Sequence, residues 1–225
     1  MNTKKIFLIC IGVFTSLLVM TQNAEKPAIT FAVLAGPNFQ NFSGKDFNGN
    51  DLNGSGIVGF HAGVNAQIRF VPDFYFQPGL LYSTKGAEIK DNLITGTYKL
   101  TYLELPLNLV YKSSLGSGYI MLGFGPYVGY GIKGNATYVT GTGSVESKVE
   151  FKNVVEANDP LTSTYIKKLD VGANAFAGYE MAGGLFIQLN TQFGLININP
   201  DDTRFPEGET ALKNIGFGLS LGYRF

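Results

Sequence analysis

The chain ends in a stretch that alternates large apolar residues with small or polar ones: Asn214-Ile215-Gly216-Phe217-Gly218-Leu219-Ser220-Leu221-Gly222-Tyr223-Arg224-Phe225. Successive side chains of a β-strand point to opposite faces, so this stretch has one apolar face and one face of small or polar residues. A soluble sheet needs such a strand only once. A transmembrane barrel needs it in every strand, because lipid lies outside and a polar interior lies inside. The stretch therefore predicts a lipid-facing strand, provided that the rest of the chain repeats the pattern.

Seven earlier segments repeat the alternation: residues 29–39, 57–70, 74–84, 97–112, 118–133, 168–181 and 185–195. Long polar segments (40–56, 85–96, 134–167 and 196–213) alternate with short turns (71–73, 113–117 and 182–184) between them. Transmembrane barrels show this asymmetry, with short periplasmic turns and long outer loops. The sequence therefore predicts an all-β protein, an eight-stranded antiparallel up-and-down transmembrane β-barrel. Both mature termini would be periplasmic, and the four long loops would lie outside.

The N-terminus has the features of a secretory signal. Lys4 and Lys5 precede an apolar run over residues 6–20, which is short for a membrane-spanning helix. We expect a signal peptide over residues 1–24, with the cleavage point open, and an outer-membrane barrel domain over residues 25–225. Cys10 is the only cysteine and lies in this run, so the mature chain would lack disulfides and cysteine-bound zinc. Zero net charge gives no basic field for nucleic acid.

Four segments together resemble the PorT-like outer-membrane β-barrel domain family: residues 76–86 (FQPGLLYSTKG), 102–111 (YLELPLNLVY), 125–130 (GPYVGY) and 219–225 (LSLGYRF). The resemblance spans roughly residues 29–225. It implies an outer-membrane location and an eight-stranded barrel, and it makes Pro78 and Pro106 expected features of their strands. It brings no catalytic residues and no specific function.

Several charged residues fall on the predicted inward faces. Near the short turns and the C-terminus these are Arg69, Lys112, Glu180 and Arg224, while Glu104 and Asp170 lie deeper or nearer the outer rim. Paired carboxylates can perform acid–base chemistry. In a narrow barrel a structural network is favoured, because buried charges must be paired. We predict that Glu180 contacts Arg224, Arg69 or Lys112.

His61 is the only histidine, and we predict that it faces the interior. A lipid-modifying barrel enzyme would need such a histidine with a serine and an acidic partner, but an interior histidine without a catalytic role is favoured. Acidic residues of the last long loop could bind calcium: Asp201, Asp202, Glu207 and Glu209. Solvated side chains are the favoured interpretation. We therefore expect no catalytic residue, no cofactor and no metal site.

These observations favour a monomeric, non-enzymatic outer-membrane barrel whose partners are the membrane lipid and, during insertion, the outer-membrane assembly machinery. It would act through its outer loops, by partner binding or adhesion, or in membrane structure. The last strand would carry the assembly signal through its apolar face: Phe217, Leu219, Leu221, Tyr223 and Phe225. Two alternatives remain open, a soluble secreted lipocalin-like barrel that binds an apolar ligand and a lipid-modifying barrel enzyme.

Overall fold

The computed structural model describes residues 29–46, 49–52, 54–90, 93–204 and 210–225. Within these ranges eight strands form a closed ring: β1 (Ile29–Lys45), β2 (Gly54–Val71), β3 (Phe74–Lys90), β4 (Ile94–Leu115), β5 (Gly118–Thr140), β9 (Leu169–Met181), β10 (Leu185–Gly194) and β12 (Ala211–Arg224). Each strand pairs antiparallel with the next in this series, and β12 pairs with β1. The predicted eight-stranded up-and-down barrel is confirmed. The expected signal peptide over residues 1–24 lies outside the described residues.

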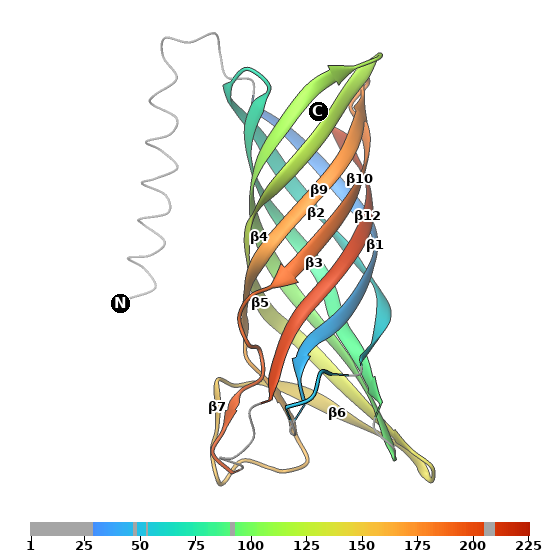
Figure 1. Cartoon of the computed structure of the whole chain (residues 1–225), viewed down its shortest axis with the longest axis vertical. Helices are drawn as coiled ribbons and strands as arrows, with labels where there is room; N and C mark the ends of the chain where they lie inside the picture. The colour runs from blue at the N-terminus through green and yellow to red at the C-terminus, as the bar shows by residue number, and fades with distance from the viewer. Residues whose placement is uncertain (1–28, 47–48, 53, 91–92, 205–209) are drawn as a thin grey trace, which may run out of the picture.

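Short turns and long loops lie at opposite ends of the barrel (Figure 1). We call these the short-turn end and the loop end. The short-turn end holds the β2–β3, β4–β5 and β9–β10 connections, and the C-terminus lies there too. Within the described ranges, no helix is both long enough and apolar enough to cross a membrane.

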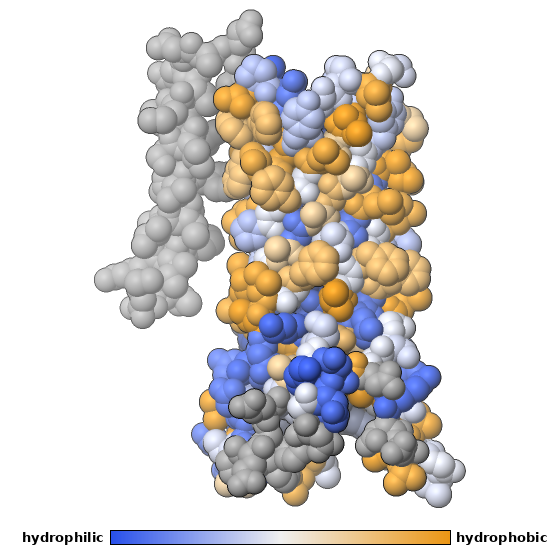
Figure 2. Space-filling model, viewed as in Figure 1, coloured by the Kyte–Doolittle hydropathy of each residue, from blue (hydrophilic) through white to orange (hydrophobic). Residues whose placement is uncertain are grey.

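The outer surface of the barrel carries a belt of apolar side chains (Figure 2). Phe124, Leu189 and Phe217 are 62%, 65% and 60% exposed, whereas inward side chains such as Gln67 and Glu104 are buried. A lipocalin-like barrel would have the opposite arrangement, with apolar side chains lining the interior. The soluble-barrel alternative is therefore wrong, and the outward apolar face suits a lipid environment.

The closing pair of strands, β1 and β12, is in register along most of its length. Val33 pairs with Tyr223, and Phe39 pairs with Phe217, whose ring stacks on that of Phe39 at 5.0 Å between centroids. The backbone N–H of Phe225 donates to the carbonyl oxygen of Phe31 at 2.8 Å. The last residues of the chain thus hydrogen-bond to the first strand, as the predicted closure requires.

The strands extend further at the loop end than the sequence predicted. Much of the predicted loop 85–96 belongs to β3 and β4, and β1 continues through residues assigned to loop 40–56. The predicted loop 134–167 contains the end of β5 and three further strands: β6 (Gly143–Phe151), β7 (Val154–Val155) and β8 (Thr164–Ile166). In the predicted loop 196–213 lie β11 (Asp201–Asp202) and the start of β12. The apolar alternation marks only the part of a strand that faces lipid, whereas the backbone ladder continues beyond it.

The interior of this extension is apolar. Its buried cluster consists of Phe42, Ala87, Leu100, Tyr102, Ala136, Val149, Ile166 and Ile198. Tyr98, Tyr138 and Phe151 pack against it. The extension at the loop end therefore has an apolar core of the kind that soluble domains have. The midsection of the barrel, in contrast, has a polar interior.

Candidate functional site

The first polar group inside the barrel lies at the short-turn end and comprises Lys112 of β4, Glu180 of β9 and Arg224 of β12. We call it the short-turn cluster. The Glu180 carboxylate accepts hydrogen bonds from Lys112 Nζ at 2.6 Å and from Arg224 Nε at 2.9 Å. Arg224 Nη1 also donates to Asn65 Oδ1 at 3.2 Å. The structure thus brings together three of the four residues that the sequence placed in a network.

Arg69, the fourth, does not join them. Its side chain is exposed and forms no ion pair within the described part of the chain. β2 ends two residues later, and its register with β3 shifts between Arg69 and Val71. At this irregular strand end the side chain reaches solvent, and including it in the network was wrong.

The second polar group, which we call the loop-end cluster, consists of Lys85, Glu104 and Asp170. The Lys85 side chain is 0% exposed and contacts Glu104 Oε1 at 2.7 Å and Asp170 Oδ2 at 3.0 Å. Tyr127 and Asn214 donate to Asp170 Oδ2 at 3.1 and 2.9 Å, respectively. The Lys85 ammonium also lies 4.3 Å from the centre of the Tyr127 ring, a cation–π contact. This cluster, together with Tyr127, fills the barrel between its midsection and the apolar core of the loop end.

Lys85 was not among the predicted inward charges, because the apolar alternation of its strand stops before it and the residue was assigned to a loop. A signal was present, since Lys85 continues the inward series of Gln77, Gly79 and Ser83 by one more step of two. Glu104 and Asp170 were recognised as inward charges, but their partner was not.

Between the two clusters lies a cavity of about 60 Å³ lined mainly by neutral polar side chains. His61 Nε2 lies 2.6 Å from Ser220 Oγ, which also accepts a hydrogen bond from Asn190 Nδ2 at 2.7 Å. A catalytic serine–histidine pair needs an acidic group that orients the histidine. No carboxylate hydrogen-bonds to His61 within the described residues, so the pair lacks the partner that a lipid-modifying enzyme requires.

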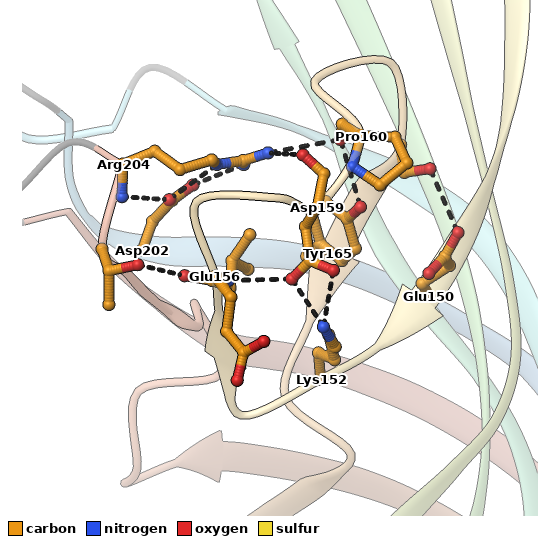
Figure 3. A network of polar contacts seen from close by, with 11 residues as sticks. Glu150, Lys152, Glu156, Asp159, Pro160, Tyr165, Asp202 and Arg204 are labelled. Carbon is orange, nitrogen blue, oxygen red and sulfur yellow. Dashed lines mark hydrogen bonds and ion pairs between the residues drawn. The ribbon is translucent and has the colours of Figure 1, made fainter.

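A third polar group lies beyond the loop end of the barrel and joins two long loops (Figure 3). Arg204 binds Asp202 through two hydrogen bonds, Nε to Oδ1 at 2.8 Å and Nη2 to Oδ2 at 2.6 Å. Its Nη1 donates to the backbone carbonyls of Asp159 and Pro160 at 3.1 and 3.2 Å. The guanidinium also lies over the Tyr165 ring at 5.4 Å. One arginine thus connects the segment after β11 to the segment between β7 and β8.

We call this group, with two further contacts, the outer loop brace. Lys152 Nζ donates to Asp159 Oδ1 at 2.6 Å, and β7 pairs in parallel with β11. Asp201 and Asp202, considered above as calcium ligands, instead pair with Lys167 and Arg204, and Glu207 and Glu209 lie outside the described residues. The described residues contain no group of three or more histidine, cysteine or acidic side chains able to hold a metal.

The brace depends on an ionised Asp159. The hydrogen bond from Lys152 lowers the pKa of the Asp159 carboxyl below its ordinary value of 3.8, and the backbone N–H of Glu156 acts in the same direction. A carboxyl whose pKa is lower in the folded loop than in the unfolded loop stabilises the folded loop at pH above its ordinary pKa. This stabilisation is present at neutral pH and is lost in acid, as the pH falls through the lowered value.

A closed barrel with an apolar outer belt and a polar interior defines an integral β-barrel membrane protein. Residues 21–199 match the family described as outer membrane protein beta-barrel domain. The chain belongs to this family and is an outer-membrane protein.

Solved structures of outer-membrane barrels are similar to the chain at low identity. Ail, the attachment invasion locus protein of Yersinia pestis, is 14% identical, with 87% of this chain and 98% of that chain covered and a TM-score of 0.42. Neisserial surface protein A is 15% identical, with 88% and 97% covered and a TM-score of 0.40. The N-terminal β-barrel domain of Pseudomonas aeruginosa OprF is 14% identical, with 86% and 97% covered and a TM-score of 0.33. No curated protein sequence matches the chain.

The loop-end cluster gives a first prediction. Replacing Lys85 with Met leaves Glu104 and Asp170 buried without a cation, and we expect the free energy of unfolding to fall by about 3–5 kcal/mol. Urea unfolding from lipid vesicles measures this change. The neutral triple variant Lys85→Met, Glu104→Gln, Asp170→Asn should regain most of the loss. Lys90→Met, an exposed lysine on the same strand, should change the free energy by no more than about 0.5 kcal/mol. Equal stability of Lys85→Met and the wild type would contradict a structural role for the cluster.

The outer loop brace gives a second prediction. Asp159→Asn imitates the protonated carboxyl, so chymotrypsin should cleave residues 152–166 faster in this variant at neutral pH while the barrel stays intact. The wild-type loop should lose amide-exchange protection only at pH below about 4, after correction for intrinsic exchange rates. Glu146→Gln changes an exposed carboxylate outside the brace and is the control. Identical cleavage of the three proteins would show that the ion pair does not order the loop.

Proposed function

We propose that the chain is a non-enzymatic outer-membrane protein that acts through its folded outer loops, by binding a partner or through adhesion. The observation that carries this proposal is the outer loop brace. Arg204 links two loops from distant parts of the sequence, and Lys152 forms an ion pair within one of them. Ordering a loop costs conformational entropy, and the barrel itself closes without these residues. A loop surface that is already ordered loses less conformational entropy when it binds a partner.

The loops also present apolar side chains to solvent. Leu161 is 74% exposed and Val145 is 67% exposed, and both lie beyond the apolar belt. Single exposed apolar residues are common on protein surfaces. Leu161 and Val145 therefore serve as accessible positions at which contact of the loops with a partner can be measured.

The filled interior argues against a diffusion pore. The interior of an eight-stranded barrel is only wide enough for side chains. In this barrel the loop-end cluster and the adjoining apolar core occupy it. The isolated His61–Ser220 pair gives no support to the enzyme alternative.

The proposal also includes the orientation of the barrel in the membrane and its oligomeric state. Short turns and termini would be periplasmic and the loop end outside, as in other transmembrane barrels. The protein would be a monomer, since the ring is closed by its own strands and needs no second chain to complete it. The more specific PorT-like resemblance rests on the four sequence segments given above.

Site-specific photo-crosslinking in living cells tests the proposal. A benzoylphenylalanine in place of Leu161 or Val145 should yield a discrete adduct with another protein. The same residue in place of Leu189, on the lipid-facing surface, should yield none. Failure of both loop positions to form an adduct would contradict partner binding through the loops.

Orientation is measured separately in the same cells. A membrane-impermeant maleimide should label Leu161→Cys in intact cells and should label Ala182→Cys, in the β9–β10 turn, only after lysis. A Cys10→Ser background removes the only native cysteine. The reverse labelling pattern would show that the loops are periplasmic.

The assembly signal is tested by Phe225→Ser. The backbone bond from Phe225 to Phe31 does not need the side chain, so we expect the variant to refold in detergent like the wild type. Its level in the outer membrane should nevertheless fall, because the assembly machinery would no longer recognise the terminal aromatic residue. Phe124→Ser, in the apolar belt of β5, is the matched control. Equal outer-membrane levels of both variants would contradict a signal role for Phe225.

A further inference from the structure

A group of lysines lies on the outward face at the loop end, around β4, β5 and β6. We call Lys99, Lys133, Lys148 and Lys168 the lysine patch. Asn135 of β5 pairs with Lys99 of β4 on one side and with Lys148 of β6 on the other. Residues directly opposite each other share a face of a sheet, so both lysines point to the same side as Asn135. Lys133, two residues before Asn135, also lies on this side.

A β-bulge places Lys133 outward. Thr101 of β4 pairs with Lys133 and Tyr102 pairs with Gly131, so Ile132 is the extra residue. Before the bulge the even-numbered residues of β5 face outward, among them Val128 and Tyr130. After it the odd-numbered residues do, because one inserted residue reverses the alternation.

Three of the four lysines of the patch line a hollow of about 820 Å³. Lys133, Lys148 and Lys168 line it together with Lys152 and Glu150. Lys152 is already paired with Asp159. In the described part of the chain, the four lysines of the patch form no ion pair with a carboxylate. Glu150 offsets one of the three positive charges of Lys133, Lys148 and Lys168, so the hollow keeps an excess of positive charge.

The patch begins where the apolar belt ends. Tyr130 and Ile132 are outward, belong to the belt and line the same hollow as Lys133. The Lys168 ammonium lies 5.1 Å from the centre of the Tyr130 ring. Figure 2 shows hydrophilic residues directly beyond the belt at this end. Lysines at this level lie where lipid headgroups meet water, because aromatic side chains mark the interface of a membrane barrel.

We infer that the lysine patch binds the phosphate groups of an anionic lipid headgroup in the leaflet that surrounds the loop end. The unneutralised lysines bind the phosphates, and the adjoining outward Tyr130 and Ile132 contact the acyl chains of the same lipid. A soluble phosphate would use only the lysines, whereas the continuity with the apolar belt favours a lipid. The assignment of this leaflet to the cell exterior rests on the orientation under the proposed function.

Native mass spectrometry of the purified protein in detergent micelles tests the inference, with bisphosphorylated lipid A as the probe lipid. Lys133→Gln with Lys148→Gln should weaken lipid A binding roughly 10- to 30-fold, given about 1 kcal/mol per basic residue near a lipid surface. Lys45→Gln with Lys90→Gln removes the same charge at the same end, but from lysines already paired with Asp51 and Glu88. This control should bind lipid A like the wild type.

Equal weakening in both double variants would overturn the inference, because general charge would then explain the binding. No weakening in either would overturn it as well. Displacement of lipid A by an equal concentration of inorganic pyrophosphate would overturn the assignment to a lipid. The photo-crosslinking at Leu161 does not depend on these lysines. Its adduct should persist in the Lys133→Gln, Lys148→Gln variant, so the proposed function and this inference can fail independently.

Discussion

The barrel depends on the pairing of its first and last strands. In lipid no water is available to bond an exposed backbone N–H or carbonyl group, so a sheet that spans the membrane must have no free edge. β1 and β12 supply this closure through a ladder that runs from Ala32–Arg224 to Lys45–Ala211. Every other strand can pair with a neighbour close in sequence or one loop away, whereas this pair joins the two ends of the chain. The interior and both ends of the barrel take their shape from it.

Closure creates a narrow interior that side chains fill, and this decides where charges can lie. An isolated charge there would be costly, whereas paired and hydrogen-bonded charges are tolerated. The described residues accordingly hold interior ion pairs at two levels, around Glu180 and around Lys85. Between them the cavity is lined mainly by neutral amides and hydroxyls, with Glu104 at its border. Such pairs add little net stability compared with apolar packing, but each fixes the relative position of strands that are distant in sequence.

The sequence revealed what depends on alternation and missed what depends on contacts between distant segments. The eight strands and the Glu180 contacts were predictable, because period-2 alternation assigns faces and short turns place strand ends together. Lys85 was missed because the strand was ended where apolar residues stop, although the ladder continues to Lys90. Arg69 was wrongly included because alternation does not reveal a register shift. The brace around Arg204 could not be predicted, since the backbone carbonyls that Arg204 binds across the loops lie 45 and 44 residues earlier.

At the loop end the apolar and polar faces of the strands are exchanged relative to the midsection. Before the bulge at Ile132, apolar residues of β5 point outward and small or polar residues point inward. After the bulge, Lys133 and Asn135 face outward, while Ala136 is buried in the apolar core. This is the arrangement of a soluble domain, and it is what the physics requires once the strands leave the lipid, because water now lies outside. The extension thus has an apolar core of its own. The bulge at Ile132 marks the change between the two arrangements, because one inserted residue turns Ala136 into the apolar core and Lys133 outward.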